Sequence, residues 1–387
     1  MFKILTLNNI SVKGLEHLPR EHYEVASETA RPDAILVRSH KMHGMQIPPT
    51  LKAVGRAGAG VNNIPVGELS RLGIPVFNSP GANANAVKEL VLAGMLVASR
   101  NICQSWDYAR RLQGDDQWLN QAIEAEKEQF AGFELPGRTL GVFGLGAIGV
   151  LVANAARALG MNVVGYDPRI TVARAWQLSA DVERAHSIDD MLSRVDFVTF
   201  HVPLMEETQR MINHERLKRM RDNAVILNFA RAGIVDDAAV CEAIDAGKIY
   251  AYVCDFPSAR LKNHPRVIAL PHLGASTREA EDNCAVMVAQ QVRDYLEQGT
   301  IRNSVNFPEV NLPRKGVARL AVVNDNVPDM VAKISHFLGN RMVNIMHMVN
   351  ESNGALAYTL LDTDTAVSAD LVADIVATEG VLRARAI

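Results

Sequence analysis

The sequence predicts an α/β protein with two doubly wound parallel sheets, followed by a smaller ferredoxin-like domain. At 387 residues the chain exceeds the size of one ordinary domain and fits two or three. Two regions alternate apolar runs of strand length with helical patterns, which is typical of Rossmann- or flavodoxin-like sheets. Residues 317–387 then read as strand, helix, two strands, helix and strand, the βαββαβ order of a ferredoxin-like module.

The predicted elements follow in chain order. The first region contains four strands: KILTLN (3–8), AILVRS (34–39), LKAVGRAG (51–58) and IPVFN (74–78). A helix is predicted over 83–101 and a polar excursion over 113–134. The second region contributes six strands between 139 and 272: TLGVFG, NVVGYD, DFVTFHV, AVILNFA, IYAYVCD and RVIALPH. A long helix follows over about 277–297, and residues 299–316, rich in Asn, Pro and Gly without any period, are typical of a linker.

Composition and net charge narrow the range of functions that this chain could have. With 48% hydrophobic and 21% charged residues, the chain resembles a globular protein that has a sizeable core. A net charge of −3 favours neither nucleic acid nor an anionic membrane as a partner. The N-terminus lacks the pattern of a secretory signal, and the longest apolar helical stretch, 89–100, is too short to span a bilayer. The four cysteines show no CxxC spacing, so we expect reduced thiols in a cytoplasmic protein, with no zinc or other metal site.

The strongest local motif is GxGxxG, formed by Gly144, Gly146 and Gly149 after a predicted strand and at the opening of a helix. The first glycine allows a tight turn, the second lets a pyrophosphate approach the backbone, and the third lets the helix pack on the strand. Asp167 ends the next strand, where a carboxylate binds the adenosine ribose hydroxyls and repels a 2′-phosphate. The motif therefore predicts a dinucleotide site that prefers NAD, although Arg169 offsets part of that repulsion.

Three polar residues follow apolar strands. Arg231 follows AVILNFA, His201 lies at the end of DFVTFHV, and His272 follows RVIALP. Ligands bind at the carboxyl ends of strands in open α/β sheets, and an arginine there can hold a carboxylate through two parallel hydrogen bonds. Arg231 could equally pair with Asp236 or Asp237. Position alone does not choose between the two histidines as an acid/base group, and either could be a solvated loop residue.

Seven segments carry a resemblance to a known family. They occur in one order: RSH at 38–40, GRAGAGVNNI at 55–64, GIPVFNSPGANANAVKE at 73–89, GLGAIG at 144–149, HVPL at 201–204, NFARAGIVD at 228–236 and PHLGAST at 271–277. Over about residues 1–305 the chain resembles the D-isomer-specific 2-hydroxyacid dehydrogenases, and among them the D-3-phosphoglycerate dehydrogenases. Residues 317–387 resemble an ACT domain, an amino-acid-sensing module.

The resemblance implies roles for individual residues. His272 falls on the acid/base histidine of the family, Arg231 on its substrate-orienting arginine, and His201 on a structural His-x-Pro. Implied contacts to NAD come from Gly144, Gly146, Ala147, Ile148, Gly149, Asp167, Phe229, Ala230, Arg231, Asp255, His272 and Gly274. Implied contacts to substrate come from Arg38, Ser39, Gly58, Ala59, Gly60, Val61, Asn83 and Arg231. In the tail, Asn324, Asn326 and Asn344 match positions that bind an effector, L-serine, at a subunit interface.

The resemblance also implies domains and chemistry. A discontinuous substrate domain is expected over 1–84 and 276–304, an NAD domain over 85–275, a linker over 305–316 and the ACT domain over 317–387. The implied reaction is NAD-dependent oxidation of 3-phosphoglycerate to 3-phosphohydroxypyruvate, the entry to serine synthesis, in a homodimer or homotetramer. His272 would take the proton of the 2-hydroxyl, and Arg38 is the first candidate for the phosphate. Two alternatives stay open: reduction of another 2-oxo acid, such as hydroxypyruvate or 2-oxoglutarate, or an inactive NAD-sensing regulator.

One departure from the family bears on catalysis. The family usually places a glutamate shortly after the aspartate equivalent to Asp255, where it bonds the catalytic histidine. In CDFPSARLKNHP the equivalent place falls on Ala259 or Arg260, and no carboxylate occurs between Asp255 and Glu279. A cation beside His272 would disfavour the imidazolium. On that hypothesis catalysis survives, with the basic limb of its pH profile at lower pH than in relatives that carry the glutamate.

Overall fold

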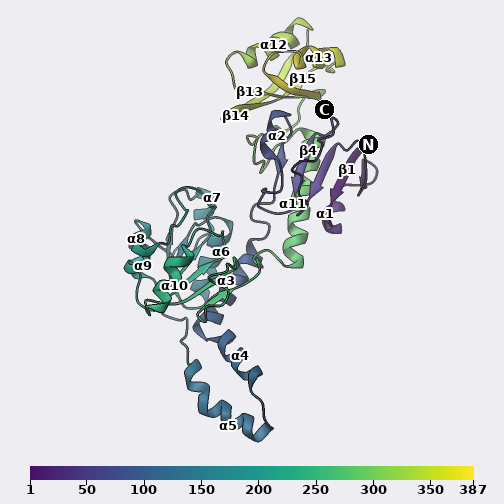
Figure 1. The fold of residues 1–387 in the computed structure, drawn as a ribbon. Coiled ribbons are helices and arrows are strands. Elements are labelled where there is room, and N and C mark those ends of the chain that lie inside the picture. Colours follow the sequence, from purple (N-terminus) through teal and green to yellow (C-terminus); the bar gives the residue numbers. More distant parts are fainter. The chain divides into compact units, whose positions relative to one another are not determined.

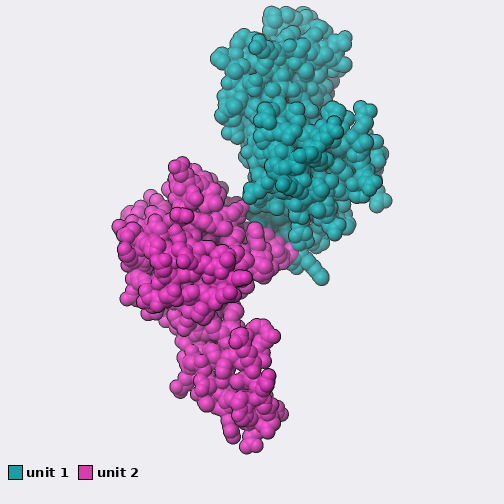
Figure 2. All heavy atoms as spheres, in the orientation of Figure 1, with its two compact units in different colours: residues 1–83, 278–387 teal, residues 84–277 magenta.

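The structure is a computed structural model that describes residues 1–387, and the chain divides into two compact units. Unit 1 consists of residues 1–83 and 278–387, and unit 2 consists of residues 84–277 (Figure 2). Each unit is built around a parallel sheet, and unit 1 carries a second, antiparallel sheet at its C-terminal end (Figure 1).

The parallel sheet of unit 1 has the strand order β2-β1-β3-β4-β5. Its strands are β1 (Phe2–Leu7), β2 (Tyr23–Ala26), β3 (Ala34–Val37), β4 (Ala53–Arg56) and β5 (Val76–Phe77). Four of them were predicted from apolar runs, and this part of the fold class is confirmed. All neighbours are parallel, so Val37 and Arg56 pair at the carboxyl edge of the sheet, where polar loop residues such as Arg38 follow.

The long helix predicted after PHLGAST is present as α11 (Arg278–Gln298) and packs on this sheet. Two glycines allow α11 to pack closely against α1 (Val12–Leu15) and against strand β4. A Cβ on Gly14, in α1, would lie 2.6 Å from the backbone of Ala285, and one on Gly55 would lie 2.6 Å from the side chain of Val288. On the opposite face of the sheet lies α2 (Val66–Arg71), whose Leu69 shares a core with Ile35 and Val54. None of the helices in the structure combines the length and the apolarity needed to cross a membrane.

Unit 2 contains a seven-stranded parallel sheet of order β12-β11-β10-β9-β6-β7-β8. Its strands are β6 (Thr139–Phe143), β7 (Asn162–Tyr166), β8 (Glu183–Arg184), β9 (Phe197–Phe200), β10 (Ala224–Asn228), β11 (Ile249–Cys254) and β12 (Val267–Ala269). Its helices are α3 (Ala84–Ser99), α6 (Ala147–Ala158), α7 (Val172–Ala175), α8 (Ile188–Arg194), α9 (His214–Arg219) and α10 (Asp237–Asp245). The strand order reverses between β6 and β9, so the glycine motif after β6 lies at the switch point where open α/β sheets bind ligands.

The predicted polar excursion over 113–134 is part of a helical hairpin, a secondary structure that the prediction did not specify. The hairpin consists of α4 (Ile102–Arg111), α5 (Asp116–Glu126) and a 3₁₀ turn, η1 (Lys127–Phe130). The side chain of Asp115 accepts a hydrogen bond from the Trp118 amide at 2.8 Å and so begins α5. No residue of α4 or α5 is buried, so neither helix contributes to a core. It projects from the rest of unit 2 (Figure 1).

The C-terminal sheet is antiparallel, of order β14-β15-β13-β16, with two helices on one face. Its elements are β13 (Ala318–Asp325), α12 (Met330–Asn340), β14 (Ile345–Asn353), β15 (Leu356–Thr363), α13 (Ala369–Val376) and β16 (Val381–Ala386). This βαββαβ order confirms the predicted ferredoxin-like module, consistent with an ACT domain.

The other face of this sheet packs against the first domain of unit 1. Ala321, Val323, Tyr358 and Leu360 share one apolar core with Phe77, Tyr295 and Leu296. The predicted linker belongs to the same core, since Ile301 and Val310 bridge each other and Phe307 and Leu312 are buried. The segment is therefore irregular but packed, and it does not behave as a free spacer.

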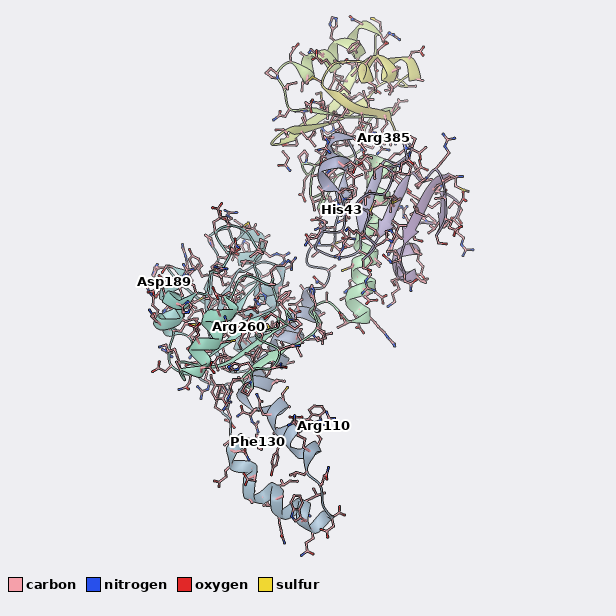
Figure 3. The ribbon with its side chains drawn as sticks, in the orientation of Figure 1. His43, Arg110, Phe130, Asp189, Arg260 and Arg385 are labelled. Atoms are coloured by element: carbon pink, nitrogen blue, oxygen red, sulfur yellow. The ribbon has the colours of Figure 1, made fainter.

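Polar side chains of the C-terminal sheet cap the end of α11. Arg319 Nη1 donates to the carbonyl of Gln298 at 2.9 Å, and the Tyr358 hydroxyl donates to that of Gly299 at 2.7 Å. Arg385 donates to the carbonyls of Tyr295 and Leu296, and its guanidinium lies 4.5 Å from the Tyr295 ring centre (Figure 3). The last carbonyls of a helix lack intrahelical partners and carry partial negative charge. Two arginines thus satisfy and neutralise this helix end.

Arg319 is itself held by a buried ion pair. Its guanidinium and the Asp362 carboxylate form two hydrogen bonds of 2.6 and 3.0 Å, and both side chains are at most 1% exposed. Asp362 also accepts from the Lys315 amide at 2.8 Å. Burial opposes ionisation of Asp362, but Arg319 and the amides outweigh it and hold the pKa of the carboxyl below its usual range. The pair therefore stays charged and fixes the arginine against α11.

We predict that Arg319→Ala destabilises unit 1 by about 3–5 kcal/mol, because it leaves the Asp362 carboxylate buried without a partner. Thermal unfolding followed by circular dichroism measures the effect. The matched control is Arg341→Ala, which removes an ion pair with Asp374 that is exposed on both sides and is expected to cost about 1 kcal/mol or less. Equal losses in the two variants would contradict the role assigned to the buried pair.

Candidate functional site: a dinucleotide loop, an imidazole and a guanidinium

The loop between β6 and α6 has the backbone geometry that its glycines predict. Gly144 has φ +88°, and a Cβ there would lie 2.6 Å from the carbonyl of His201. A Cβ on Gly149 would lie 1.9 Å from the carbonyl of Gly144, so only glycine lets α6 start this close to β6. Gly146 meets nothing within 4 Å, which leaves its backbone open to a ligand. Ala147 and Ile148 open the helix, whose free N–H groups and partial positive charge suit a pyrophosphate.

Asp167 follows β7 and is fixed against this loop. One carboxylate oxygen accepts from the Leu145 amide and the other from the Arg169 amide, both at 2.8 Å. The carboxylate is half-exposed, so it retains lone pairs for the two hydroxyls of a ribose. The glycine loop and Asp167 together fit a dinucleotide that lacks a 2′-phosphate.

His201 is a structural residue. Its Nε2 lies 3.1 Å from the Thr199 hydroxyl, and its amide donates to the Phe143 carbonyl at 2.8 Å. Burial of the ring lowers the pKa of His201 to about 3, so the imidazole is neutral at every physiological pH. A group that cannot be protonated near neutrality does not serve as a reversible acid/base, which leaves His272 as the histidine for that role.

His272 opens onto a cavity of about 350 Å³ at the carboxyl edge of the sheet. Its backbone has φ +52°, and its amide donates to the carbonyls of Asp255 and Leu270 at 3.0 and 3.1 Å. The ring is exposed, makes no hydrogen bond, and lies against Phe256 with ring centres 5.3 Å apart. The cavity lining also includes Ala232, Gly233, Asp237, Tyr252, Asp255, Pro257 and Ser258.

Asp255 connects the parts of this site. It follows β11, is 1% exposed, and its Oδ2 accepts from the Gly274 amide at 3.1 Å. Burial raises the pKa of Asp255, whereas the Gly274 amide and the charges of His272 and Arg231 act in the opposite direction. Since His272 and Arg231 both act on this one carboxylate, the imidazole and the guanidinium lie on the same edge of the sheet. Its Oδ1 is buried without a partner, and thus free for an amide donor on a ligand.

Arg231 is held by its backbone while its side chain stays available. The Asn228 side chain donates to the Arg231 carbonyl at 3.0 Å and accepts from the Ala230 amide at 3.2 Å. The guanidinium donates to the Ala230 carbonyl at 2.6 Å and forms no ion pair. Asp236, one of the acidic partners considered from the sequence, instead caps α10 and pairs with Arg210 at 3.8 Å. Arg231 is therefore free to bind a carboxylate.

The substrate-side residues lie in unit 1. Arg38 follows β3, forms an ion pair with Glu281 of α11, and lines a cavity of about 470 Å³ with Asn8, Asn9 and Ser11. Ser39 is exposed beside it, and Asn83 is half-exposed at the end of unit 1.

The loop Gly58–Val61 follows β4. Gly58 has φ +148°, its amide donates to the Ser79 hydroxyl at 3.2 Å, and a Cβ there would overlap the Arg56 guanidinium. Ala59, Gly60 and Val61 are half-exposed, so their amides face outward at the sheet edge.

The three asparagines matched to an effector site are not brought together within one chain. Asn324, which ends β13, pairs with Ala357, whereas Asn344 precedes β14 at the opposite end of the sheet, near Thr363. The positions that Asn324 and Asn344 face, Ala357 and Asp364, are seven residues apart, which is about 23 Å along a strand. Asn326 lies near Asn324 and donates to the Gly354 carbonyl at 2.9 Å.

Comparisons with known proteins agree with this geometry. Residues 92–274 match the sequence model described as "D-isomer specific 2-hydroxyacid dehydrogenase, NAD binding domain". The chain is 31% identical over 351 residues to the D-3-phosphoglycerate dehydrogenase of Haemophilus influenzae, covering 87% of this chain and 81% of that protein. The chain belongs to the D-isomer-specific 2-hydroxyacid dehydrogenase family.

Two further similarities define the extent of the match. The chain is 38% identical over 302 residues to the D-3-phosphoglycerate dehydrogenase of Methanocaldococcus jannaschii, covering 76% of this chain but 53% of that protein. The chain thus spans about half the length of several curated relatives that it matches. Among solved structures, NAD⁺-bound 3-phosphoglycerate dehydrogenase of Entamoeba histolytica is 25% identical, with TM-score 0.62, covering 79% of this chain and 98% of that one.

The structure also places the departure from the family pattern. Neither Ala259 nor Arg260, the two positions that the sequence offered for the family's glutamate, lines the cavity of His272. Burial raises the pKa of the Cys241 thiol, and Arg260 opposes that shift, so the guanidinium lies near α10 (Figure 3). Sequence reasoning missed Asp237, Tyr252 and Phe256, which line the cavity with His272. The pair Asp236-Asp237 looked like an ordinary helix start, and only the fold shows that the second aspartate faces a cavity.

We predict that His201 lowers the free energy of unfolding at acidic pH. Its pKa is about 3 when folded and about 6.5 in an unfolded chain, so the unfolded state binds the extra proton. The contribution of neutral His201 to the free energy of unfolding is therefore complete above about pH 6.5, and it is lost as the pH falls toward 3. His201→Asn should flatten this dependence, whereas His186→Asn, at an exposed histidine, should not. Urea unfolding followed by tryptophan fluorescence reports on unit 2, which holds all three tryptophans. If the free energy of unfolding depends on pH in the same way in wild type and His201→Asn, the prediction is wrong.

Proposed function

We propose that this chain is an NAD-dependent dehydrogenase that oxidises 3-phospho-D-glycerate to 3-phosphohydroxypyruvate, the first step of L-serine biosynthesis. The observation that carries the proposal is the arrangement around Asp255, which is acted on by both His272 and Arg231 at the edge of an NAD-binding sheet. The curated relatives named above are D-3-phosphoglycerate dehydrogenases.

Each residue has a defined task in this reaction. Arg231 binds the substrate carboxylate through parallel charge-assisted hydrogen bonds. Neutral His272 accepts the proton of the 2-hydroxyl, and in the reverse direction the imidazolium returns a proton to the ketone oxygen. NAD, held by the glycine loop and Asp167, would supply the acceptor for the hydride of C2. Asp255 fixes the loop of His272 through its carbonyl and the loop of Gly274 through its carboxylate, which holds the acid/base in place.

Arg38 is the candidate for the substrate phosphate. It lies at the carboxyl edge of the sheet of unit 1 and lines a cavity, as a phosphate-binding cation requires. Its ion pair with Glu281 is exposed on both sides and hence weak enough for a phosphate to replace it.

The test is oxidation of NADH, followed at 340 nm, with phosphohydroxypyruvate and with hydroxypyruvate. We expect turnover of the phosphorylated substrate. We also expect Arg38→Ala to raise its KM by about 10–100-fold, because a charge-assisted pair contributes about 1.5–3 kcal/mol, while the KM for hydroxypyruvate changes little. Lys41→Ala, at a nearby exposed cation that the proposal does not use, is the control. Equal losses for both substrates would place the phosphate elsewhere, and NADH binding without turnover would favour a sensor over an enzyme.

We also propose that the protein is a homo-oligomer that associates through the hairpin α4–α5. The hairpin exposes Trp106 by 61% and Trp118 by 47%, along with Ile102 and Ile123. Exposed tryptophans on one element are typical of interfaces, where they supply most of the binding energy.

Replacing Trp106 and Trp118 together by Glu should shift the protein toward monomers in sedimentation velocity, because two charges then enter an apolar contact. Trp176→Glu is the control, since Trp176 is 86% exposed and lies outside the hairpin. An unchanged sedimentation coefficient in the double variant would exclude the hairpin as the interface.

The C-terminal sheet supports a further proposal, an L-serine effector site shared by two chains. The Oδ1 of Asn324 is buried and lacks a partner, and its Nδ2 donates only to the neighbouring Asp325 carbonyl at 2.7 Å. The separation of Asn324 from Asn344 means that a site containing both requires a second copy of the sheet.

A further inference from the structure

The cavity of His272 contains a carboxylate that no other group uses. Asp237 is the first residue of α10 and lines the cavity with His272 and Tyr252. Its neighbour Asp236 caps the helix, accepting from the amides of Ala238 and Ala239 at 3.0 and 3.1 Å. The Asp237 carboxylate accepts no hydrogen bond and forms no ion pair. The positive end of α10 stabilises a negative charge at this position.

The other groups facing His272 are already engaged or lack a suitable charge. Asp255 is the only other carboxylate in the cavity; its Oδ2 accepts from the Gly274 amide, and its buried Oδ1 is the oxygen assigned above to an amide donor of a ligand. Burial raises the pKa of Tyr252 well above its usual value, so the phenol is neutral. Arg231, which acts on Asp255, is a cation and so supplies no negative partner for the imidazole.

Two further elements lie near the site without supplying a partner. From α3, Val87 approaches Gly274, and the charged Lys88 and Glu89 bond to Asn85. Arg260 acts on Cys241 and lies outside the cavity lining.

His272 needs a negative partner for its task. When it accepts the hydroxyl proton it becomes an imidazolium, and an anion beside the ring favours that charge and fixes the ring orientation. The ring lies against Phe256, and its nitrogens make no hydrogen bond within the chain. Asp237 is the one uncommitted anion that shares its cavity.

We propose that Asp237 is the positioning residue for His272, and takes the place of the glutamate that this chain lacks. The carboxylate holds one imidazole nitrogen across the cavity, directly or through one bridging water, and favours the charged ring. Asp237 does not touch the substrate. This inference rests on the proposed function, because it assigns His272 the acid/base role.

The test compares Asp237→Asn with wild type in the full-length protein through two readouts. The first is the pH dependence of carbethoxylation of His272 by diethylpyrocarbonate, which modifies the neutral ring, measured by mass spectrometry of its peptide. We expect the midpoint to move by about one pH unit to lower pH, because loss of a neighbouring anion disfavours the imidazolium. The second is kcat/KM for ketone reduction, whose basic limb should move to lower pH by the same amount while KM changes little.

Three variants make the outcome decisive. Asp237→Glu keeps the charge and should restore the wild-type midpoint, and Asp237→Ser gives a second neutral side chain if the amide disturbs folding. Glu242→Gln changes an exposed carboxylate of the same helix that pairs with His214, and should have no effect. A wild-type midpoint in both neutral variants would overturn the proposal. If the wild type shows no turnover, the proposed function fails, but the carbethoxylation midpoints still decide whether Asp237 acts on His272.

Discussion

The site depends on one buried carboxylate. Asp255 is 1% exposed, yet it is surrounded by an amide, an imidazole and a guanidinium that oppose the effect of burial on its ionisation. Through its carbonyl and its side chain it binds both His272 and Gly274, so it determines where the loop after β12 runs. That loop follows an edge strand of only three residues, which offers few backbone hydrogen bonds of its own. A polar anchor from the neighbouring strand β11 therefore replaces the missing sheet contacts.

The C-terminal sheet is part of the architecture of unit 1. Arg319, Arg385 and Tyr358 place their donors on the final carbonyls of α11, the helix that completes the first domain. Arg383 reaches further and donates to the Leu51 carbonyl at 2.5 Å, despite burial, which lowers its pKa. This face of the sheet is thus a set of cations directed at backbone oxygens and embedded in an apolar core. Such an interface is specific, since Arg383 and Arg385 are half-buried and form no ion pair that could replace a lost carbonyl.

Most of the fold could be predicted because its signals are local. Apolar runs such as AVILN and the GxGxxG turn are properties of short segments, and both appear where the sequence places them. Elements without a buried face were missed: β8 is two exposed residues, and α5 buries nothing. The segment 299–316 was interpreted as a spacer because its apolar residues follow no period, but Phe307 and Leu312 are buried without belonging to a helix or strand.

The candidate site could be predicted in part. His272 was favoured over His201 by family resemblance, and the structure adds the physical reason, since burial keeps His201 neutral. The backbone carbonyls that Arg319 and Arg385 contact on α11 leave no trace in a sequence. Asp237 follows an aspartate that already caps the helix, so its pattern carried no separate signal.

The most direct test of the central claim is a crystal structure with NAD⁺ and 3-phosphoglycerate bound. The account predicts a nitrogen of His272 within about 2.6–3.2 Å of the C2 hydroxyl oxygen, and the guanidinium of Arg231 bidentate on the carboxylate of the same molecule. If His272 and Arg231 bind different ligands, or if neither contacts the hydroxy acid, the account is wrong.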